Sequence, residues 1–399
     1  MKQKSLIITL VIVISIKFLT ACKYDVAEPM WDKEFPEAPI PKIIQVDPAQ
    51  AKPGVNTITI YGENLDVNGT NVYFDNILAE MVSVSPIKIV VRRPNLATQS
   101  SYIKVVPNQA LTVAKYGPYK IDKVLERYGS FLDNLQLSVL AVDKNENLYV
   151  VEAASRNIVK VTPDGQKSII GLATRPPTDA KVGPGGKLYM PGNNRSIDVV
   201  DLSTGEVKEW LRLPSGKVVK FGDFDANGYF YTGGTRSDLV IIAPDLSVKS
   251  AGFYTTDEIL AIRVFNGYVY VASRKASSQE PAKIWRHSID DKGNVGSREL
   301  VFDLSTSSEF SSRLIRGLAF SENGIMFIAT DSSNPILIFD MASNQLDYFY
   351  KNIIPPYCKN FYWGNGSFLY MISGDATAGQ EWTVYRVDMG SNSAPYYGG

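Results

Sequence analysis

Arginine residues recur at one kind of position in the last two thirds of this 399-residue chain. Each lies in a polar loop that follows an apolar run with an aromatic residue at its centre: Arg156, Arg195, Arg236 and Arg274. The planar guanidinium group can hold a carboxylate through two parallel hydrogen bonds, so a group of such loops on one face would bind an acidic ligand. In the alternative interpretation, these arginines are solvated and pair with nearby acidic residues such as Glu152, Asp238 and Asp331.

Aromatic residues in other loops are the second group of candidate ligand-binding residues. Flat rings are stacking platforms for sugars, and five lie in or beside loops that we place on the same face: Tyr254, Phe310, Tyr350, Tyr357 and Trp382. We select Tyr254, Tyr357 and Trp382 as ligand-binding residues, with Trp382 the strongest candidate. The alternative for each of them is packing inside or between the structural repeats.

Metal-dependent catalysis has few candidate ligands in this sequence. The chain contains one histidine, His287, and two cysteines, which excludes a histidine-rich metal site and a zinc ribbon. A site for a divalent cation stays open, because oxygen donors occupy neighbouring loop positions: Glu152, Asn193, Asn194 and Asp331. No spacing rule selects these four residues. We therefore expect no catalytic residue and no cofactor, with a divalent cation as the alternative.

The composition excludes several classes of protein. The chain has 41 Lys and Arg against 41 Asp and Glu, and 21% of its residues are charged. Nucleic-acid binders and disordered acidic chains need a sustained excess of one sign, so we expect neither. The length predicts roughly two or three domains.

The loops that carry the candidate residues belong to an internal repeat. A triplet with an aromatic centre recurs at intervals of 39 to 57 residues, and a turn containing Gly or Asn precedes each copy: Leu148-Tyr149-Val150, Leu188-Tyr189-Met190, Phe230-Tyr231-Thr232, Val269-Tyr270-Val271, Met326-Phe327-Ile328 and Leu369-Tyr370-Met371. A unit of strand, tight turn, strand, loop and strand at about 40 residues is typical of a propeller blade. Six copies predict six blades, with the ligand site on the face formed by the loops. The connections between blades add Arg175, Arg313 and Arg316.

Two copies of the repeat resemble the NHL and gluconolactonase-like six-bladed propellers most closely: residues 140–150, which read LAVDKNENLYV, and residues 318–328, which read LAFSENGIMFI. In gluconolactonase-like relatives, the resemblance implies a divalent cation held by Glu and Asn or Asp at the channel mouth. We expect the propeller to span residues 119–391. Residues 119–128 form a spare strand, which we expect to pair outside the last strand of blade six and so to cover an exposed edge.

The preceding segment, residues 40–115, predicts a small β-sandwich. Apolar and polar residues alternate there in short runs that are separated by turn residues. Residues 57–65, TITIYGENL, and residues 89–94, IVVRRP, resemble an IPT/TIG immunoglobulin-like domain. The resemblance implies a spacer, with a binding role as the alternative.

The first 21 residues have the features of a lipoprotein signal peptide. Lys2 and Lys4 precede an apolar run too short to span a bilayer, and the run ends in Leu-Thr-Ala-Cys. This ending resembles a lipobox, which implies cleavage before Cys22, acylation of Cys22 and attachment to the membrane by lipid alone. An ordinary signal peptide with an incidental cysteine is the alternative. Cleavage would leave 38 basic against 41 acidic residues, and residues 22–39, rich in Pro and acidic residues, predict a tether.

These features together predict an all-β protein made of an Ig-like β-sandwich followed by a six-bladed β-propeller. The order of anchor, tether, spacer and propeller is similar to that of surface glycan-binding lipoproteins of the outer membrane. The resemblance implies a non-catalytic binder of a polysaccharide or oligosaccharide, with an outer-membrane transporter as a candidate partner. The loop arginines favour an acidic glycan as its ligand, bound on one propeller face. The alternatives are a metal-assisted lactonase or polysaccharide-cleaving enzyme, and a scaffold for protein docking or adhesion.

Overall fold

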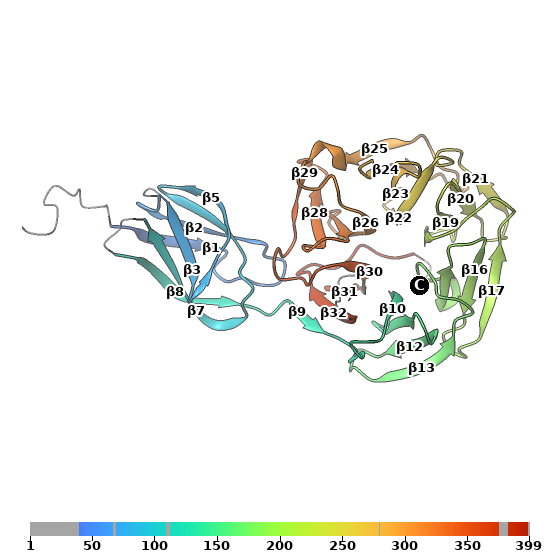
Figure 1. Ribbon diagram of the computed structural model, residues 1–399, viewed down its shortest axis with the longest axis horizontal. Coiled ribbons are helices and arrows are strands. Elements are labelled where there is room, and N and C mark those ends of the chain that lie inside the picture. The colour runs from blue at the N-terminus through green and yellow to red at the C-terminus, as the bar shows by residue number, and fades with distance from the viewer. Residues whose placement is uncertain (1–39, 67–68, 109–111, 279, 375–381, 398–399) are drawn as a thin grey trace, which may run out of the picture.

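The computed structural model describes residues 40–66, 69–108, 112–278, 280–374 and 382–397. These residues form eight four-stranded sheets, two in a small sandwich and six in a ring (Figure 1). The helical segments among them are two 3-10 turns, Pro184–Gly186 and Leu304–Thr306. The predicted all-β fold, a sandwich followed by a six-bladed propeller, is confirmed. The predicted signal peptide, Cys22 and the tether lie outside the described residues.

Among the described residues, no helix has the length and apolar character that would let it cross a bilayer.

The sandwich consists of two antiparallel sheets whose inner faces pack together. One sheet has the order β1 (Lys42–Asp47), β2 (Thr57–Glu63), β6 (Lys88–Arg92) and β5 (Met81–Ser85). The other has the order β4 (Ile77–Leu78), β3 (Thr70–Phe74), β7 (Thr98–Pro107) and β8 (Ala114–Ile121). Alternate residues of β2 and β6, such as Ile58, Ile60 and Ile89, are fully buried, because a strand turns every second side chain to the same face.

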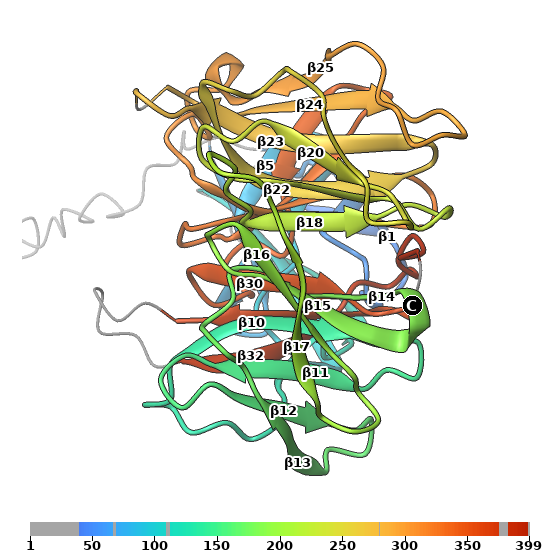
Figure 2. The ribbon, with the colours of Figure 1, turned by 90° about the vertical axis from the view of Figure 1, so that its right-hand side faces the viewer.

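The first three blades follow one another along the chain, each with its first strand innermost (Figure 1), and Figure 2 shows the ring from the side. Blade one contains β10 (Leu137–Val142), β11 (Leu148–Glu152), β12 (Asn157–Val161) and β13 (Lys167–Leu172). Blade two contains β14 (Lys181–Gly183), β15 (Lys187–Pro191), β16 (Ser196–Val200) and β17 (Val207–Arg212). Blade three contains β18 (Phe221–Phe224), β19 (Phe230–Gly233), β20 (Leu239–Ile242) and β21 (Val248–Ser250).

The last three blades have the same order, except that blade six takes its outer strand from the N-terminal side. Blade four contains β22 (Asp257–Phe265), β23 (Tyr268–Lys275), β24 (Lys283–Ser288) and β25 (Glu299–Asp303). Blade five contains β26 (Ile315–Phe320), β27 (Met326–Thr330), β28 (Ile336–Asp340) and β29 (Gln345–Tyr348). Blade six contains β30 (Cys358–Trp363), β31 (Phe368–Ser373), β32 (Thr383–Asp388) and β9 (Leu125–Arg127).

The repeated aromatic residue stabilises the first turn of its blade. In blade one, Asp143 accepts a hydrogen bond from the backbone N–H of Asn147 at 2.9 Å and another from the hydroxyl of Tyr149 at 2.9 Å. In blade three, the hydroxyl of Tyr231 donates to Asp225 at 3.0 Å in the same way. The repeat is therefore a means of holding the turn between the first two strands, because the aspartate satisfies backbone donors of the turn.

Strand β9 closes the ring. It pairs antiparallel with β32, with Glu126 opposite Arg386, and these two side chains form an ion pair. The expected closing segment, residues 119–128, is divided between the two bodies. Tyr119 and Ile121 are buried in the sandwich as the end of β8, so the sandwich extends past the expected boundary at residue 115. Only the part from Leu125 onward completes blade six.

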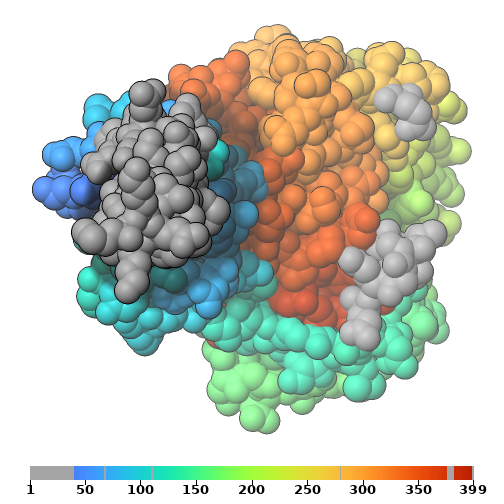
Figure 3. All heavy atoms as spheres, turned by 60° about the vertical axis from the view of Figure 1, so that its left-hand side comes forward, coloured from blue at the N-terminus to red at the C-terminus, as the bar shows by residue number. Residues whose placement is uncertain are grey.

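The sandwich rests against the last two blades through polar contacts (Figure 3). Arg92 forms two hydrogen bonds with Asp347, each 2.6 Å long. Asn56 donates to the carbonyl of Tyr348 at 2.7 Å and accepts from the backbone N–H of Tyr350 at 2.8 Å. These paired contacts fix the sandwich at one place on the rim of the ring.

Arg93 lies at the centre of this contact region and is almost fully buried. Its guanidinium donates to the carbonyls of Ala51, at 3.0 Å, and Lys52, at 2.7 Å, and also to the carbonyl of Asp122. The same group lies 5.6 Å from the ring centroid of Tyr350, in the segment that connects β29 of blade five to β30 of blade six. Burial of its charge lowers the pKa of Arg93. One side chain thus connects the sandwich, the linker to β9 and the propeller.

Candidate functional site

The inner strands of four blades contain a β-bulge at equivalent points. In each case the register with the second strand skips one residue: between Leu137 and Val139, Ile259 and Ala261, Ile315 and Gly317, and Cys358 and Asn360. A bulge leaves one residue without a partner on the next strand and redirects its side chain. The four skipped residues are Ser138, Leu260, Arg316 and Lys359.

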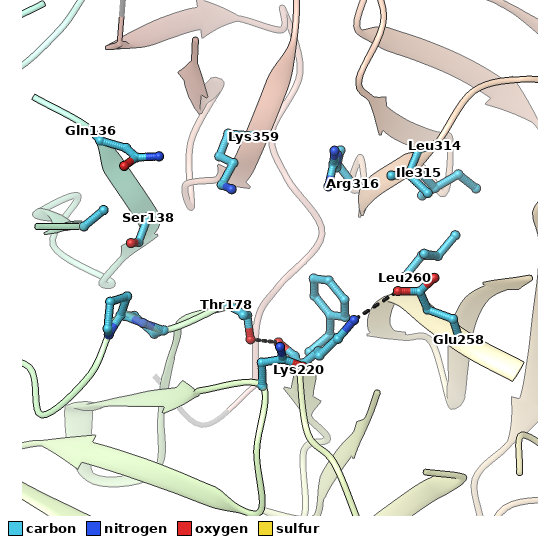
Figure 4. A pocket seen from close by; sticks show the side chains of 15 residues that line it. Gln136, Ser138, Thr178, Lys220, Glu258, Leu260, Leu314, Ile315, Arg316 and Lys359 are labelled. Atoms are coloured by element: carbon cyan, nitrogen blue, oxygen red, sulfur yellow. Dashed lines mark hydrogen bonds and ion pairs between the residues drawn. The ribbon is translucent and has the colours of Figure 1, made fainter. Parts of the chain in front are cut away.

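All four skipped residues line one cavity at the end of the channel where the inner strands begin (Figure 4). The cavity has a volume of about 400 Å³. Thr178 and Lys220, from the segments that lead into blades two and three, complete the wall, so every blade contributes a residue. Thr178 donates to the carbonyl of Lys220 at 2.7 Å, which connects these two segments. We call this space the channel-mouth cavity.

One carboxylate lines the described wall of this cavity, and it is neutralised. Glu258 accepts from Lys220 at 3.0 Å and from Arg274 at 3.0 Å, one cation on each oxygen. Partial burial opposes the charged form of Glu258, but these two hydrogen bonds outweigh it and lower the pKa of Glu258. Glu258 therefore stays ionised and is held in place by its partners.

Basic residues outnumber acidic residues among the described residues of the wall. Lys220, Arg316 and Lys359 line the cavity together with Glu258. Arg316 is 3.8 Å from Asp331, at the outer limit of an ion pair, and its side chain is 38% exposed. A concave site lined by one sign of charge attracts ligands of the opposite sign. The arrangement is suited to holding an anion.

The predicted loop arginines lie outside the cavity. Among the described residues that line it, none is one of the four selected from the sequence: Arg156, Arg195, Arg236 and Arg274. Arg274 reaches the site indirectly through Glu258, and Arg156 donates to the carbonyl of Thr174 at 2.9 Å. Arg195 and Arg236 lie in the corresponding loops of blades two and three. Of the four predicted arginines, Arg274 therefore contacts the site, through its hydrogen bond with Glu258.

Two of the three selected aromatic residues are buried. Tyr254 is fully buried in blade four, where its hydroxyl is 2.8 Å from His287 Nε2, and Trp382 belongs to the apolar core around blade one. Phe310 and Tyr350, also expected on the loop face, are buried too. This corrects the expectation that their rings are open to a sugar, because core packing covers the ring faces. Tyr357 is half-buried in the loop before β30.

Two of the candidate catalytic or metal-binding residues, Glu152 and His287, are engaged in contacts within the protein. Glu152 accepts from Ser155 and, at 2.8 Å, from Asn157. Within the described ranges, His, Cys, Asp and Glu form no group of three that could hold a metal ion. His287 is fully buried, and burial lowers its pKa. Its Nδ1 faces the carbonyl of Gly296 at 3.0 Å, and the ring packs in the buried interior of blade four.

Sequence reasoning missed Lys220 and Lys359 as site residues. The sequence pattern favours the loops between second and third strands, whereas the cavity is lined by the first residues of the inner strands. A comparison of the repeats by position would have found part of it, because Ser138, Arg316 and Lys359 each follow the residue that opens the pairing of an inner strand. The bulge itself leaves no mark in composition or periodicity.

The sandwich has a recognisable family. Residues 41–121 match the sequence profile of the IPT/TIG domain. The sandwich is an IPT/TIG domain. This match extends to the end of β8, in agreement with the longer boundary in the structure. Curated proteins provide no match to the chain.

Solved structures resemble the chain in fold. An auxiliary nutrient binding protein from Bacteroides thetaiotaomicron has 11% identity and a TM-score of 0.51, covering 87% of this chain and 98% of that one. A gluconolactonase from Xanthomonas campestris has 14% identity and a TM-score of 0.52, covering 66% of this chain and 89% of that one. The calcium-binding protein regucalcin from Agrobacterium tumefaciens has 12% identity and a TM-score of 0.53, covering 68% and 95%. At such identities the similarity establishes the propeller fold alone.

Proposed function

We propose that this protein binds an acidic carbohydrate in the channel-mouth cavity and does not cleave it. The observation that carries the proposal is the convergence of Lys220, Arg316 and Lys359, from three different blades, on a cavity whose carboxylate is already paired. A sugar carboxylate would accept charge-assisted hydrogen bonds from these cations. Phe221, which is half-buried in the wall, supplies an apolar surface for the sugar ring.

The absence of catalysis in this proposal rests on the state of Glu258. A general base must be free to take a proton, and its pKa is best placed near the working pH. Glu258 is instead held by Lys220 and Arg274, and its pKa is lowered. It orders the two cations and sets the charge of the wall.

We further propose that the mature chain begins at Cys22, which is acylated, and that residues 22–39 and the IPT/TIG domain carry the propeller at the cell surface of the outer membrane. Support comes from the sequence of residues 1–21 and from the solved auxiliary nutrient binding protein, whose similarity covers more of the chain than the propeller. A membrane transporter would then receive the carbohydrate.

Affinity electrophoresis of the unlipidated mature protein, through gels containing a uronate polymer or a neutral polymer, tests the binding proposal. We expect retardation by the uronate polymer, and Arg316→Ala with Lys359→Ala should weaken it by about tenfold. Arg156→Ala is the matched control, because it removes an exposed arginine that does not line the cavity. Equal retardation by the neutral polymer, or equal weakening by Arg156→Ala, would contradict the proposal.

Product analysis on the same samples tests the non-catalytic part. We expect the uronate polymer to keep its length distribution after prolonged incubation, with or without a chelator. Shortened chains or a lactone-hydrolysis product that disappears when a chelator is added would establish the enzymatic alternative instead.

A further inference from the structure

The C-terminal tail crosses the end of the channel opposite the channel-mouth cavity. After β32, Ser393 donates to the carbonyl of Gly366 in blade six at 3.2 Å, and Ala394 donates to the carbonyl of Phe320 in blade five at 2.8 Å. The carbonyls of Ala394 and Pro395 then accept from Arg263 in blade four, at 3.1 and 2.9 Å. Residues 393–395 therefore lie across this end of the ring.

The ring of Tyr396 is held from three sides of the channel. It stacks on Tyr362 of blade six with the ring centroids 4.2 Å apart. The guanidinium of Arg263, from blade four, lies 3.7 Å from the centroid of Tyr396, and Lys181 Nζ, from blade two, lies 5.9 Å away. Stacking and cation–π contacts of this kind are strongest where water is excluded. The tail is thus a fixed part of the channel wall.

The interior of the channel beneath the tail is filled by paired charges. Arg263 and Asp223 form an ion pair of 2.9 Å, and both side chains are almost fully buried. Lys181 and Asp179 form a second buried pair of 3.5 Å, and Asp179 also accepts from the backbone N–H of Gly222. Two basic and two acidic side chains balance, so this layer offers no net charge to a ligand. It separates the tail from the cationic mouth.

We infer that the channel-mouth cavity is a blind pocket that takes the end of an acidic glycan chain, a terminal uronate, and not an internal segment. This inference rests on the proposed function. A polymer cannot pass through a channel that Tyr396 and the Arg263–Asp223 pair obstruct. The volume of about 400 Å³ lies at the low end of the range for pockets that bury small ligands, which suits one or two sugar units.

Three aromatic residues that the sequence places on the face around the mouth offer no open ring to a polymer lying across it. A chain bound along a surface needs exposed rings beside the pocket, and core packing buries Tyr254, Phe310 and Trp382. Phe221 lies inside the cavity wall. The contacts that favour an acidic sugar are therefore concentrated in the pocket itself.

A length series of oligogalacturonates, from the monosaccharide to the octasaccharide, tests the inference by calorimetry on the folded mature protein. At equal molar concentration of chains, we expect one Kd within about twofold from the disaccharide upward, because further units lie outside the pocket. Tightening by about tenfold or more between the disaccharide and the octasaccharide would overturn end recognition and leave the proposed function in place. A failure to bind at every length would overturn both.

Capped octasaccharides provide a second measurement that needs no variant. A bulky group attached to the chain end that enters the pocket should abolish binding, and the same group on the other end should leave Kd unchanged. An octasaccharide capped at both ends that binds as tightly as the free one would overturn the inference.

Discussion

Two regions of this protein place basic side chains at the ends of strands, with opposite results. Where the sandwich meets the propeller, Arg92 is matched by both oxygens of Asp347, and Arg93 by three carbonyl groups. At the channel mouth, Lys220, Arg316 and Lys359 line a cavity whose described wall holds one carboxylate, Glu258. The contrast shows that the place of a cation, inside a contact between domains or at the wall of a cavity, separates a structural contact from a candidate binding site.

The largest effect should come from Arg93→Ala at the sandwich contact. The change leaves the carbonyls of Ala51, Lys52 and Asp122 without their donor and removes a buried side chain, so we expect the free energy of unfolding to fall by about 2–4 kcal/mol. Denaturant unfolding measures it, with Arg156→Ala as the exposed control. Uronate binding by the protein that remains folded should be unchanged. A loss below about 0.5 kcal/mol would show that the contact region does not depend on this cation.

The same isosteric change should act differently in the two regions. Glu258→Gln removes the negative charge from the channel mouth and releases Lys220 and Arg274, so we expect uronate to bind about 3–10-fold more tightly. Asp347→Asn should leave binding unchanged. Calorimetric titration of both variants provides the comparison, and weaker binding by Glu258→Gln would mean that the ordering of the cations matters more than their net charge.

Asp347→Asn should instead lower the free energy of unfolding, by about 0.5–1 kcal/mol. The effect is modest because Asp347 is 43% exposed, so solvent screens its pair with Arg92. A double-mutant cycle with Arg92→Ala measures the coupling between the two side chains. A coupling free energy near zero would mean that Arg93 and Asn56, and not the pair of Arg92 and Asp347, stabilise the contact between sandwich and propeller.

Salt should separate the regions further. Raising the ionic strength from about 50 to 500 mM should weaken uronate binding several-fold, because the mouth is open to solvent and its charges are screened. The melting temperature should change little, since the buried contacts of Arg93 are screened much less. Binding that does not respond to salt would contradict a charge-based site.

The smallest effect concerns pH. His287 is neutral in the folded protein, and burial lowers its pKa, so the unfolded chain binds more protons once the pH falls below about 6.5. Stability should therefore decline from pH 7 to pH 5, and His287→Gln should reduce that slope in melting curves. Uronate binding should stay level over this window, because the pKa of Glu258 is lowered and the charge of this carboxylate does not change. Binding that changes in parallel with stability would contradict this separation.

Most of the fold could be predicted from the sequence because its signals are local. Asp143, Asn147 and Tyr149 stabilise a single turn in blade one, and Asp225 and Tyr231 do the same in blade three. The boundary between the two bodies was misplaced for a physical reason. β8 and β9 are separated by only residues 122–124, so two strands of different domains look like one run.

The sequence predicts the chemical type of the site, basic side chains suited to an acidic ligand, but not which residues form it. The sequence predicts basic residues on the loop face, yet which of them meet depends on the bulges at Arg316 and Lys359, and these are properties of strand pairing. Trp382 and Tyr254 lie in loop-like sequence, but long-range packing buries them. Burial of a loop residue is decided by distant parts of the chain and cannot be deduced from its neighbours.

The closing strand β9 has a mechanical consequence. Because β9 follows the sandwich directly and is also the outer strand of blade six, a force applied to the N-terminal side of the chain reaches the ring through the pairing of β9 with β32. The bidentate contact between Arg92 and Asp347 lies beside this path and shares the load. A pull on the sandwich would therefore load the pairing of β9 with β32 and the contact between Arg92 and Asp347 together.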